Sequence, residues 1–398
     1  MHHLWLILVV DEDTTTTELA IFGRFTAGRF YKVAFASHSS PARRVPRAQL
    51  LFWARALVST SSRWLALELR LDGLPLLQSF LALLSPLSLP SLISFHIDLR
   101  SVDLPSSNGP FYFDGHYSTL RYLECSGYCL PWMSFCQSIQ PMPVLVCLVL
   151  ARMREETWPS YVALLHLLAT TPSLQQLALL SVGCSGQPPK SFPPLHLPSL
   201  LSVNFAFGPY VSFTGGFSSL HTLLRHLRFP PLDNLRLFFA TGSSARNFVA
   251  LDLQLRTSLL ALGGEFDPDV LNGVNGVVVL DLREIGTAIL KQIDNPTWGH
   301  SGLVLHELAV LRTGLPDWHA LRLFLQRRLA TGLPGLSVLE CFVHSSTRAL
   351  ADEVTPDSML HYTYVIHSVV SVVCIPSYSR PLDLHIHTYE NLLFPSPY

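Results

Sequence analysis

Charged residues are scarce in this sequence of 398 residues. Asp, Glu, Lys and Arg make up 14% of the chain, against about 25% in an average globular domain, whereas apolar residues make up 49%. The formal net charge is −1, and lysine occurs only at Lys32, Lys190 and Lys291. A chain without a basic excess lacks the electrostatic basis for binding nucleic acid or an anionic membrane. We therefore expect neither partner, and the composition predicts a large folded core.

The cysteines show no CxxC spacing, and their number, seven, is odd. This usage is typical of reduced, buried thiols, so we expect an intracellular protein, cytoplasmic or nuclear. Cys125, Cys129 and Cys136 lie close in sequence, but no CxxC or HxxxH pair nearby completes a zinc site. His385 and His387 have metal-capable spacing in a predicted strand, although partly exposed strand histidines explain them better. We expect no metal and no cofactor.

Uninterrupted apolar runs long enough to cross a membrane are also lacking. The segments Gly73–Leu99 and Cys125–Ala151 are nearly free of charge, but prolines break both, and a spanning helix needs about 20 consecutive apolar residues. The run Leu4–Val10 is short for the core of a signal peptide. A membrane-associated protein, suggested by the mean hydropathy of +0.33, is therefore an alternative that we do not favour.

Enzyme motifs are incomplete wherever they begin. The phrase GHSG at Gly299–Gly302 is one residue short of a nucleophile elbow around Ser301. The phrase HELAV, which starts at His306, lacks the second histidine of a zinc protease motif. No phosphate-binding P-loop and no GxGxxG follows a predicted strand. We expect no catalytic activity, and a hydrolase that uses Ser301 is a second alternative.

What the sequence does contain is a repeated phrase. LPSLISFHIDL (Leu89–Leu99) and LPSLLSVNFAF (Leu197–Phe207) begin 108 residues apart. Both contain an apolar triple of the form Leu-x-x-Leu-x-Leu, which ends in the alternation of a strand with one buried face. Ten such triples begin at Trp64, Leu92, Leu120, Leu145, Leu174, Leu200, Leu232, Val277, Leu305 and Leu336.

The triples recur every 25 to 32 residues, except for one gap of 45 after Leu232 that leaves room for a poor copy near Leu251–Leu255. Helices are predicted between the strands, at Leu74–Ser85, Trp158–Thr170 and Pro316–Gly332. A strand-and-helix unit of about 27 residues is typical of the leucine-rich repeat. We predict an α/β fold, an irregular leucine-rich-repeat-like solenoid with parallel strands on its concave side and helices on its convex side. An ordinary α/β domain with leucine-rich strands is the alternative.

The triples also predict three parts of the chain. Residues 1–45 are expected to form a poorly structured leader, and residues 46–345 the solenoid. Residues 346–398 are expected to form a C-terminal cap and tail, with a β-rich stretch at His361–Ile375, because terminal repeats must hide an open edge. The eighth position after each first leucine, where the typical repeat has Asn or Cys, never holds either residue, so we expect variable curvature.

Four features of the sequence resemble a known family: Ser62–Gly73, the LPSL phrases, Thr171–Cys184 and Asp317–Glu340. Across about residues 45–350 the chain resembles basidiomycete fungal proteins in which degenerate leucine-rich repeats follow an F-box. The resemblance implies a substrate receptor of an SCF-type ubiquitin ligase, whose F-box binds the adaptor subunit and whose repeats bind a target protein. No phrase like the LPxEILxxIF of an F-box stands in residues 1–60, so the F-box itself is not recognisable.

A repeat fold would place the residues that alternate with the buried leucines on the concave surface. We therefore expect a protein-binding face there, with a target protein of unknown identity, because a broad and preformed concavity favours extended partners. The solvated face of a sheet, without a partner, is the alternative. The candidate residues are Glu68, Arg70, His96, Asp98, Tyr122, Glu124, Asn204, Asn234, Arg236, Asp281, Arg283, Glu307 and Glu340.

Overall fold

The chain is an α/β protein with a large parallel β-sheet. It divides into two units, Met1–Pro230 (unit 1) and Pro231–Tyr398 (unit 2). The computed structural model describes residues 6–11, 14–25, 28–37, 47–84, 89–99, 119–127, 142–153, 158–186, 193–207, 223–249, 253, 255–265, 267–283, 290, 305–313, 318–344 and 371–377. Within these ranges, no helix combines the length and the apolar character that a membrane span requires.

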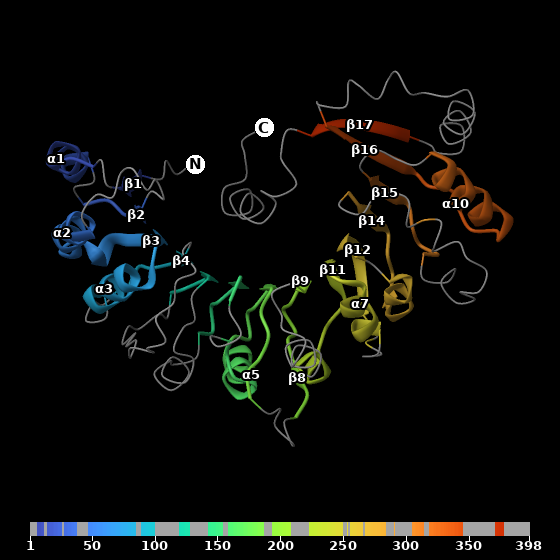
Figure 1. The fold of residues 1–398 in the computed structure, drawn as a ribbon, viewed down its shortest axis with the longest axis horizontal. Helices are drawn as coiled ribbons and strands as arrows, with labels where there is room; N and C mark the ends of the chain where they lie inside the picture. The colour runs from blue at the N-terminus through green and yellow to red at the C-terminus, as the bar shows by residue number, and fades with distance from the viewer. Residues whose placement is uncertain are drawn as a thin grey trace. The chain divides into compact units, whose positions relative to one another are not determined.

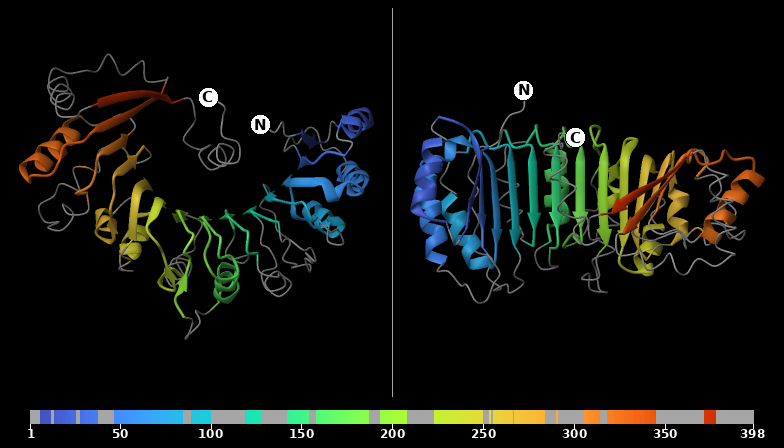
Figure 2. Two further views of the ribbon diagram at one scale, coloured as in Figure 1. Left: turned by 180° about the vertical axis from the view of Figure 1, so that it is seen from behind. Right: turned by 90° about the horizontal axis from the view of Figure 1, so that it is seen from above.

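The strands of unit 1 follow one another across the sheet in chain order. They are β1 (Leu6–Val10), β2 (Tyr31–Ala36), β3 (Trp64–Leu71), β4 (Ser94–Leu99), β5 (Tyr122–Ser126), β6 (Cys147–Ala151), β7 (Gln176–Leu180) and β9 (Ser202–Phe207). The right-hand view of Figure 2 shows them side by side. A separate parallel pair joins β8 (Leu195–His196) to β10 (Leu227–Arg228).

Parallel neighbours require the chain to return to the start of the sheet after every strand. The described helices of unit 1 lie in these returns and cover one face of the sheet (Figure 1). They are α1 (Thr16–Phe25), α2 (Arg47–Val58), α3 (Leu74–Leu84) and α5 (Tyr161–Ala169), with a short 3₁₀ turn at Ser61–Arg63. The helices predicted at Leu74–Ser85 and Trp158–Thr170 are therefore confirmed.

The apolar triples of the sequence form buried rows in the sheet of unit 1. Leu67 pairs with Phe95, and Phe95 pairs with Leu123. A second row runs through Leu69 and Ile97. All five side chains are buried, because the side-chain period of two sends equivalent positions of paired strands to the same face. The strands and the buried face predicted from the triples are confirmed in this unit.

The helices of unit 1 pack on these rows. The rings of Phe80 on α3 and Phe35 on β2 lie 4.9 Å apart between centroids, and both are fully buried. At the start of α5, the hydroxyl of Ser160 accepts a hydrogen bond of 3.2 Å from the backbone N–H of Ala163, which caps the helix. The core of unit 1 therefore lies between the sheet and its helices.

The sheet begins earlier in the chain than the triples predict. Strands β1 and β2 lie within residues 1–45, for which we expect a poorly structured leader; β1 pairs with β2, and β2 pairs with β3. Leu8, Val33 and Phe35 are buried in line with the leucines of β3. Valine and phenylalanine replace leucine in β2, which is why the pattern is weak in the sequence.

Unit 2 repeats the same arrangement. Its sheet contains β11 (Leu232–Phe239), β12 (Leu255–Gly264), β14 (Val279–Leu282), β15 (Val310–Thr313), β16 (Val338–His344) and β17 (Ser371–Ser377), all parallel, and β13 (Val274–Asn275) pairs with the start of β12. Helices α7 (Gly242–Val249) and α10 (Trp318–Ala330) lie on one face of this sheet (Figure 1), and η3 (Pro268–Gly273) is a 3₁₀ helix. Helix α10 confirms the helix predicted at Pro316–Gly332.

One repeat of unit 2 lies three residues from its predicted start. Leu311 pairs with Leu280 on one side and with Leu339 on the other. This copy therefore begins at Leu308, and the start predicted at Leu305 is wrong. Apolar residues recur at several spacings in LVLHELAVL, so the sequence alone fits more than one register.

The poor copy predicted near Leu251–Leu255 also lies farther along the chain. Leu260 of β12 pairs with Leu280 of β14, so this copy begins at Thr257. Thr257 is buried, and its hydroxyl donates a hydrogen bond of 2.9 Å to the carbonyl of Leu259. A polar residue in the leading position hides this repeat from a search for apolar triples.

The sheet of unit 2 continues into the segment predicted as a C-terminal cap. Strand β17 pairs in parallel with β16 over its whole length, from Ser371 to Ser377. The remainder of residues 346–398, with His385 and His387, lies outside the described residues. Ser301 also lies outside them.

Candidate protein-binding faces

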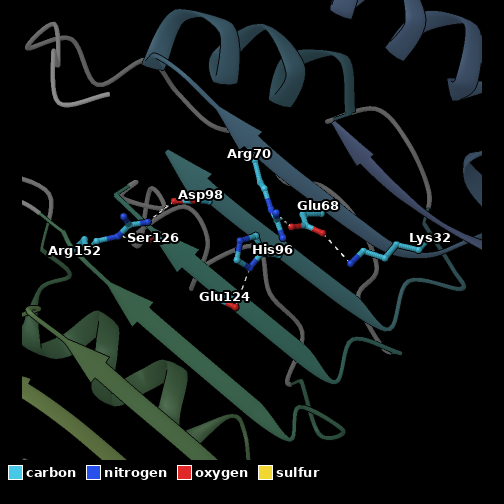
Figure 3. Close-up of polar contacts among 8 residues, drawn as sticks. All are labelled: Lys32, Glu68, Arg70, His96, Asp98, Glu124, Ser126 and Arg152. Atoms are coloured by element: carbon cyan, nitrogen blue, oxygen red, sulfur yellow. Dashed lines mark hydrogen bonds and ion pairs between the residues drawn. The ribbon is translucent and has the colours of Figure 1, made fainter. Parts of the chain in front are cut away.

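The sheet face of unit 1 opposite its helices carries a cluster of charged side chains (Figure 3). Apart from Arg152, which follows the end of β6, these residues alternate along the strands with buried apolar residues, so the period of two places them on the opposite face. The charged cluster consists of Lys32, Glu68, Arg70, His96, Asp98, Glu124, Ser126 and Arg152. Five of these residues, Glu68, Arg70, His96, Asp98 and Glu124, are candidates predicted from the sequence.

One row of the charged cluster alternates acid, base and acid. Glu68, His96 and Glu124 stand side by side on β3, β4 and β5. Nδ1 of His96 lies 2.8 Å from Oε2 of Glu124. Oε2 of Glu68 lies 2.8 Å from Nζ of Lys32, and its Oε1 accepts a hydrogen bond from Nε of Arg70. Each side chain in this row therefore has an oppositely charged neighbour.

A second group joins Asp98, Ser126 and Arg152. The Nη2 of Arg152 donates to Oδ1 of Asp98, and its Nε donates to the hydroxyl of Ser126 at 2.8 Å. Arg152 follows the end of β6 and has a φ of 52°, in the left-handed region that few residues other than glycine adopt. Strict alternation after the buried Leu150 would send Arg152 into the core, so this backbone turn is what brings its guanidinium to the charged face.

Opposing effects act on the carboxyl group of Glu68. Burial raises its pKa, but the charge and hydrogen bond of Lys32, with the charges of His96 and Arg70, lower it by more. The net pKa of Glu68 lies below its ordinary value. This carboxylate is therefore ionised at neutral pH although it is buried.

The imidazole of His96 shows the opposite shift. Burial lowers its pKa, but the hydrogen bond and charge of Glu124 and the charges of Glu68 and Asp98 raise it by more. The net pKa of His96 lies above its ordinary value. Its proton is therefore held by carboxylates on three neighbouring strands.

Two buried thiols of unit 1, Cys147 on β6 and Cys184 after β7, are unreactive. Burial raises the pKa of Cys147 and of Cys184 to about 12, with a further contribution from Glu124 at Cys147. Neither thiol is ionised at neutral pH, so neither is an activated nucleophile. Among the residues that the structure describes, no three His, Cys, Asp or Glu side chains converge as metal ligands would.

The charged cluster does not extend over the whole face of unit 1. Beyond β5 the equivalent rows hold, apart from Asn204, small or apolar residues that are buried: Val149, Ala151, Ala178, Leu180 and Ala206. The candidate Asn204 lies on β9 beside Ala178, apart from the charges. The candidate Tyr122 lies at the start of β5, between Ser94 and Cys147, and is partly exposed.

Unit 2 has its own row of charges on the face opposite its buried leucines. Asp281 on β14 is in register with Arg312 on β15, which is in register with Glu340 on β16. Arg283, directly after β14, donates to both carboxylate oxygens of Asp281, with Nη2 2.6 Å from Oδ2. Nε of Arg312 donates to Oε2 of Glu340 at 2.8 Å. Two carboxylates and two guanidinium groups are therefore paired.

The remaining candidates of unit 2 are placed differently. Asn234 and Arg236 lie on β11, both partly buried on the face that bears the charges. Glu307 lies in the exposed turn before β15 and is not on the sheet. The three-residue shift of this repeat puts Val310 at the position predicted for Glu307, and Arg312 lies two residues later, in register with Asp281 and Glu340.

The sequence therefore missed four residues of these faces: Lys32, Ser126, Arg152 and Arg312. Lys32 and Arg312 stand on strands whose repeats were unrecognised or out of register. Ser126 alternates with Cys125 and follows the rule used for the other candidates. Arg152 reaches this face because its own backbone is left-handed, and no pattern in the sequence predicts that conformation.

Comparison with known proteins does not assign the chain to a family. No protein-family model matches the sequence, and no curated protein matches it. The resemblance to F-box proteins therefore stays an expectation from the sequence.

Proposed function

We propose that the chain is a non-catalytic protein-binding module with an irregular leucine-rich-repeat-like solenoid fold. The parallel strands in chain order, in register at the repeat positions and with the described helices on one face of each unit, support the solenoid. In such a solenoid the strand face is concave, and a partner would lie across it.

The observation that carries this proposal is the charged cluster of unit 1. Seven ionisable side chains from four strands and the residue after β6 are held in place by mutual ion pairs. Preorganised groups lose little conformational entropy when they bind. Arginine and tyrosine contribute most often to the centre of protein interfaces. On this face Arg70 and Tyr122 are partly exposed and Arg152 is exposed.

The test uses a pair of matched double variants of the full chain. Arg70→Ala with Tyr122→Ala removes one arginine and one aromatic ring from the strand face. Arg55→Ala with Phe52→Ala removes the same two side-chain types from α2, where both are exposed. Proteins captured by the wild type are identified by cross-linking, and each is then purified for measurement of its Kd.

We expect the strand-face variant to weaken binding of a purified partner by at least about tenfold and the α2 variant to leave it unchanged. Thermal unfolding of both variants checks that the fold is intact. Equal affinity of the strand-face variant and the wild type would exclude this face as the binding surface. Equal loss in both variants would point to an effect on folding or to the helical face.

The narrower role of SCF substrate receptor rests on the resemblance alone. Residues 6–36 form a strand, a helix and a second strand that add to the sheet, so an adaptor would have to bind a repeat-like surface there. The full chain should be mixed with the fungal SCF adaptor subunit, beside the variant Ile21→Asp, which places a charge at an exposed apolar position of α1. Stoichiometric capture that the substitution abolishes would support this role, and absence of capture by folded wild type would remove it.

A further inference from the structure

Arg236 differs from the other charged residues on the strand face of unit 2. Its position on β11 is in register with Ala261 on β12, and Ala261 is in register with Asp281 on β14. The side chain of Ala261 has no atom that can accept a hydrogen bond from the guanidinium group of Arg236. Asp281, one strand farther, is already held by Arg283 through both carboxylate oxygens.

Arg236 has no hydrogen-bond partner for its buried Nε among the residues that the structure describes. The same holds for the buried Oδ1 of Asn234, two residues earlier on β11. Buried polar atoms of native proteins are nearly always hydrogen-bonded, so an unsatisfied pair on one strand calls for a functional explanation. One of these atoms is a donor and the other an acceptor.

The two atoms lie on a strip along β11 that continues to Phe238. Asn234, Arg236 and Phe238 alternate with the buried Leu235 and Leu237, so they share one face. Phe238 is partly exposed, and its neighbour on β12 is Gly263, which has no side chain. The strip therefore holds an amide side chain with a buried oxygen, a guanidinium group with a buried Nε and a partly exposed aromatic ring, at successive positions about 7 Å apart.

The chemistry of this strip matches an extended acidic segment of a protein. A guanidinium binds a carboxylate through two parallel hydrogen bonds more strongly than it binds a neutral acceptor. An amide oxygen near it can accept from the backbone N–H of the same segment. A cationic partner would be repelled by the charge of Arg236, so charge complementarity excludes it.

We propose that Arg236 binds an aspartate or glutamate side chain of an extended acidic segment of the protein partner, with Asn234 and Phe238 contacting the residues on either side. This inference rests on the proposed protein-binding function and names the chemistry that the strand face of unit 2 recognises. A carboxylate that reaches this guanidinium group offers an acceptor to the Nε that has none among the described residues.

The probe is a fluorescent hexaglutamate peptide, acetylated and amidated at its ends so that only side-chain carboxylates are available. Binding to the full chain is measured by anisotropy at low ionic strength, with hexaglutamine as the uncharged control. Arg236→Gln is compared with Arg246→Gln, which removes the same charge from exposed α7 in the same unit. We expect Arg236→Gln to weaken hexaglutamate binding roughly tenfold and Arg246→Gln to match the wild type.

The unfolding temperature of Arg236→Gln distinguishes a role of Arg236 in recognition from a role in stabilising the fold. Arg236→Gln breaks no ion pair and no hydrogen bond within the described residues, so its unfolding temperature should equal or exceed that of the wild type. A lower unfolding temperature together with unchanged peptide affinity would overturn the proposal, because Arg236 would then be structural. Equal losses in Arg236→Gln and Arg246→Gln, or no binding of hexaglutamate to wild type, would overturn it too.

The hexaglutamate experiment can fail or succeed independently of the partner-binding experiment that tests the proposed function. If Arg70→Ala with Tyr122→Ala abolishes binding of a partner while Arg236→Gln leaves binding of both partner and hexaglutamate unchanged, only the acidic specificity fails. If hexaglutamate binding depends on Arg236 but no protein partner is sensitive to either strand face, the protein-binding function fails and the carboxylate site remains.

Discussion

Nδ1 of His96 lies 2.8 Å from Oε2 of Glu124 on the neighbouring strand, and Glu68 stands at the same register on the other side of the imidazole. Protonated His96 therefore separates two carboxylates that would otherwise repel each other across β4. Lys32 and Arg70 relieve this repulsion only at Glu68. The charge state of one histidine thus decides whether this row of the charged cluster is attractive.

We expect His96 to stabilise the fold in a pH-dependent way. Because the folded state raises the pKa of His96, its contribution is fully present below the ordinary pKa of 6.5 and is lost as pH rises through the folded value. The free energy of unfolding of wild type should exceed that of His96→Gln most at about pH 6 and less at higher pH. Denaturant titrations at a series of pH values measure this difference. His166→Gln, at an exposed position of α5, serves as control.

Glu68 should show the opposite dependence. Its folded pKa is lowered, so its contribution is present above the ordinary value of 4.5 and is lost as pH falls through the folded value. The stability advantage of wild type over Glu68→Gln should therefore disappear in acid. An advantage that stays constant down to the folded pKa and below would show that the pairing with Lys32 and Arg70 is not energetically significant.

Gly127 allows a prediction about the turn after β5. Its φ is +68°, and a Cβ added there would lie 2.3 Å from the carbonyl oxygen of Leu99. Gly28 has a similar φ of +72°, but a Cβ there would meet no atom of the described residues within 4 Å. Gly28→Ala should cost about 1 kcal/mol of unfolding free energy from backbone strain alone. Gly127→Ala should cost roughly 3 kcal/mol or more, because strain and overlap add.

Urea unfolding of the two variants measures both costs. If the two costs were nearly equal, the backbone of β4 would have to move to accommodate the added methyl group. The close approach of Gly127 to Leu99 would then not require glycine at this position.

The buried rows could be predicted from the sequence because they follow from local chemistry alone. Leu67 and Leu69, or Leu177 and Leu179, repeat a period of two at a spacing that only one strand register satisfies, and the parallel pairing then follows. Once those leucines are placed, residues such as Glu68 and His96 must appear on the other face. Five members of the charged cluster were accessible in this way.

The remaining members depend on information that is not local. Arg312 was missed because an apolar stretch fits two registers, and only pairing with β14 and β16 selects one. Lys32 was missed because valine and phenylalanine fill the leucine positions of β2. Within the described part of the chain Nε of Arg236 has no partner, and one reason is that its neighbour on β12 is Ala261, from a different repeat. The surroundings of these residues depend on which strands become neighbours, and the sequence of a single segment does not contain that information.

The left-handed backbone at Arg152 leads to a prediction about the stability of a glycine variant at this position. Its φ of 52° is strained for any residue with a Cβ, so Arg152→Gly should be more stable than Arg152→Ala by about 1 kcal/mol. Both variants lose the ion pair with Asp98 equally, so the difference reports the backbone alone. At Ala151, one residue earlier in β6, the order should reverse, and Ala151→Gly should lower stability. Equal stability of the two Arg152 variants would contradict a left-handed conformation at this position.

Arg328 on α10 should be the most sensitive charged residue of unit 2. It is 3% exposed, and its guanidinium donates to the carbonyls of Leu305, Leu308 and Pro334, with Nη1 2.7 Å from the oxygen of Leu305. These carbonyls lie in the turns before β15 and β16, so one side chain joins the helix to two strands.

Arg328→Met keeps most of the apolar stem but leaves the three carbonyls without this donor, so we expect a loss of about 3 kcal/mol or more in unfolding free energy. Arg327→Met, at the adjacent exposed position of the same helix, should change stability by less than about 0.5 kcal/mol. Thermal and urea unfolding of both variants at neutral pH give the comparison. Similar small effects of the two substitutions would mean that water replaces the guanidinium, and that α10 is held to the sheet by its buried apolar residues, Ala320, Leu321, Phe324 and Leu325.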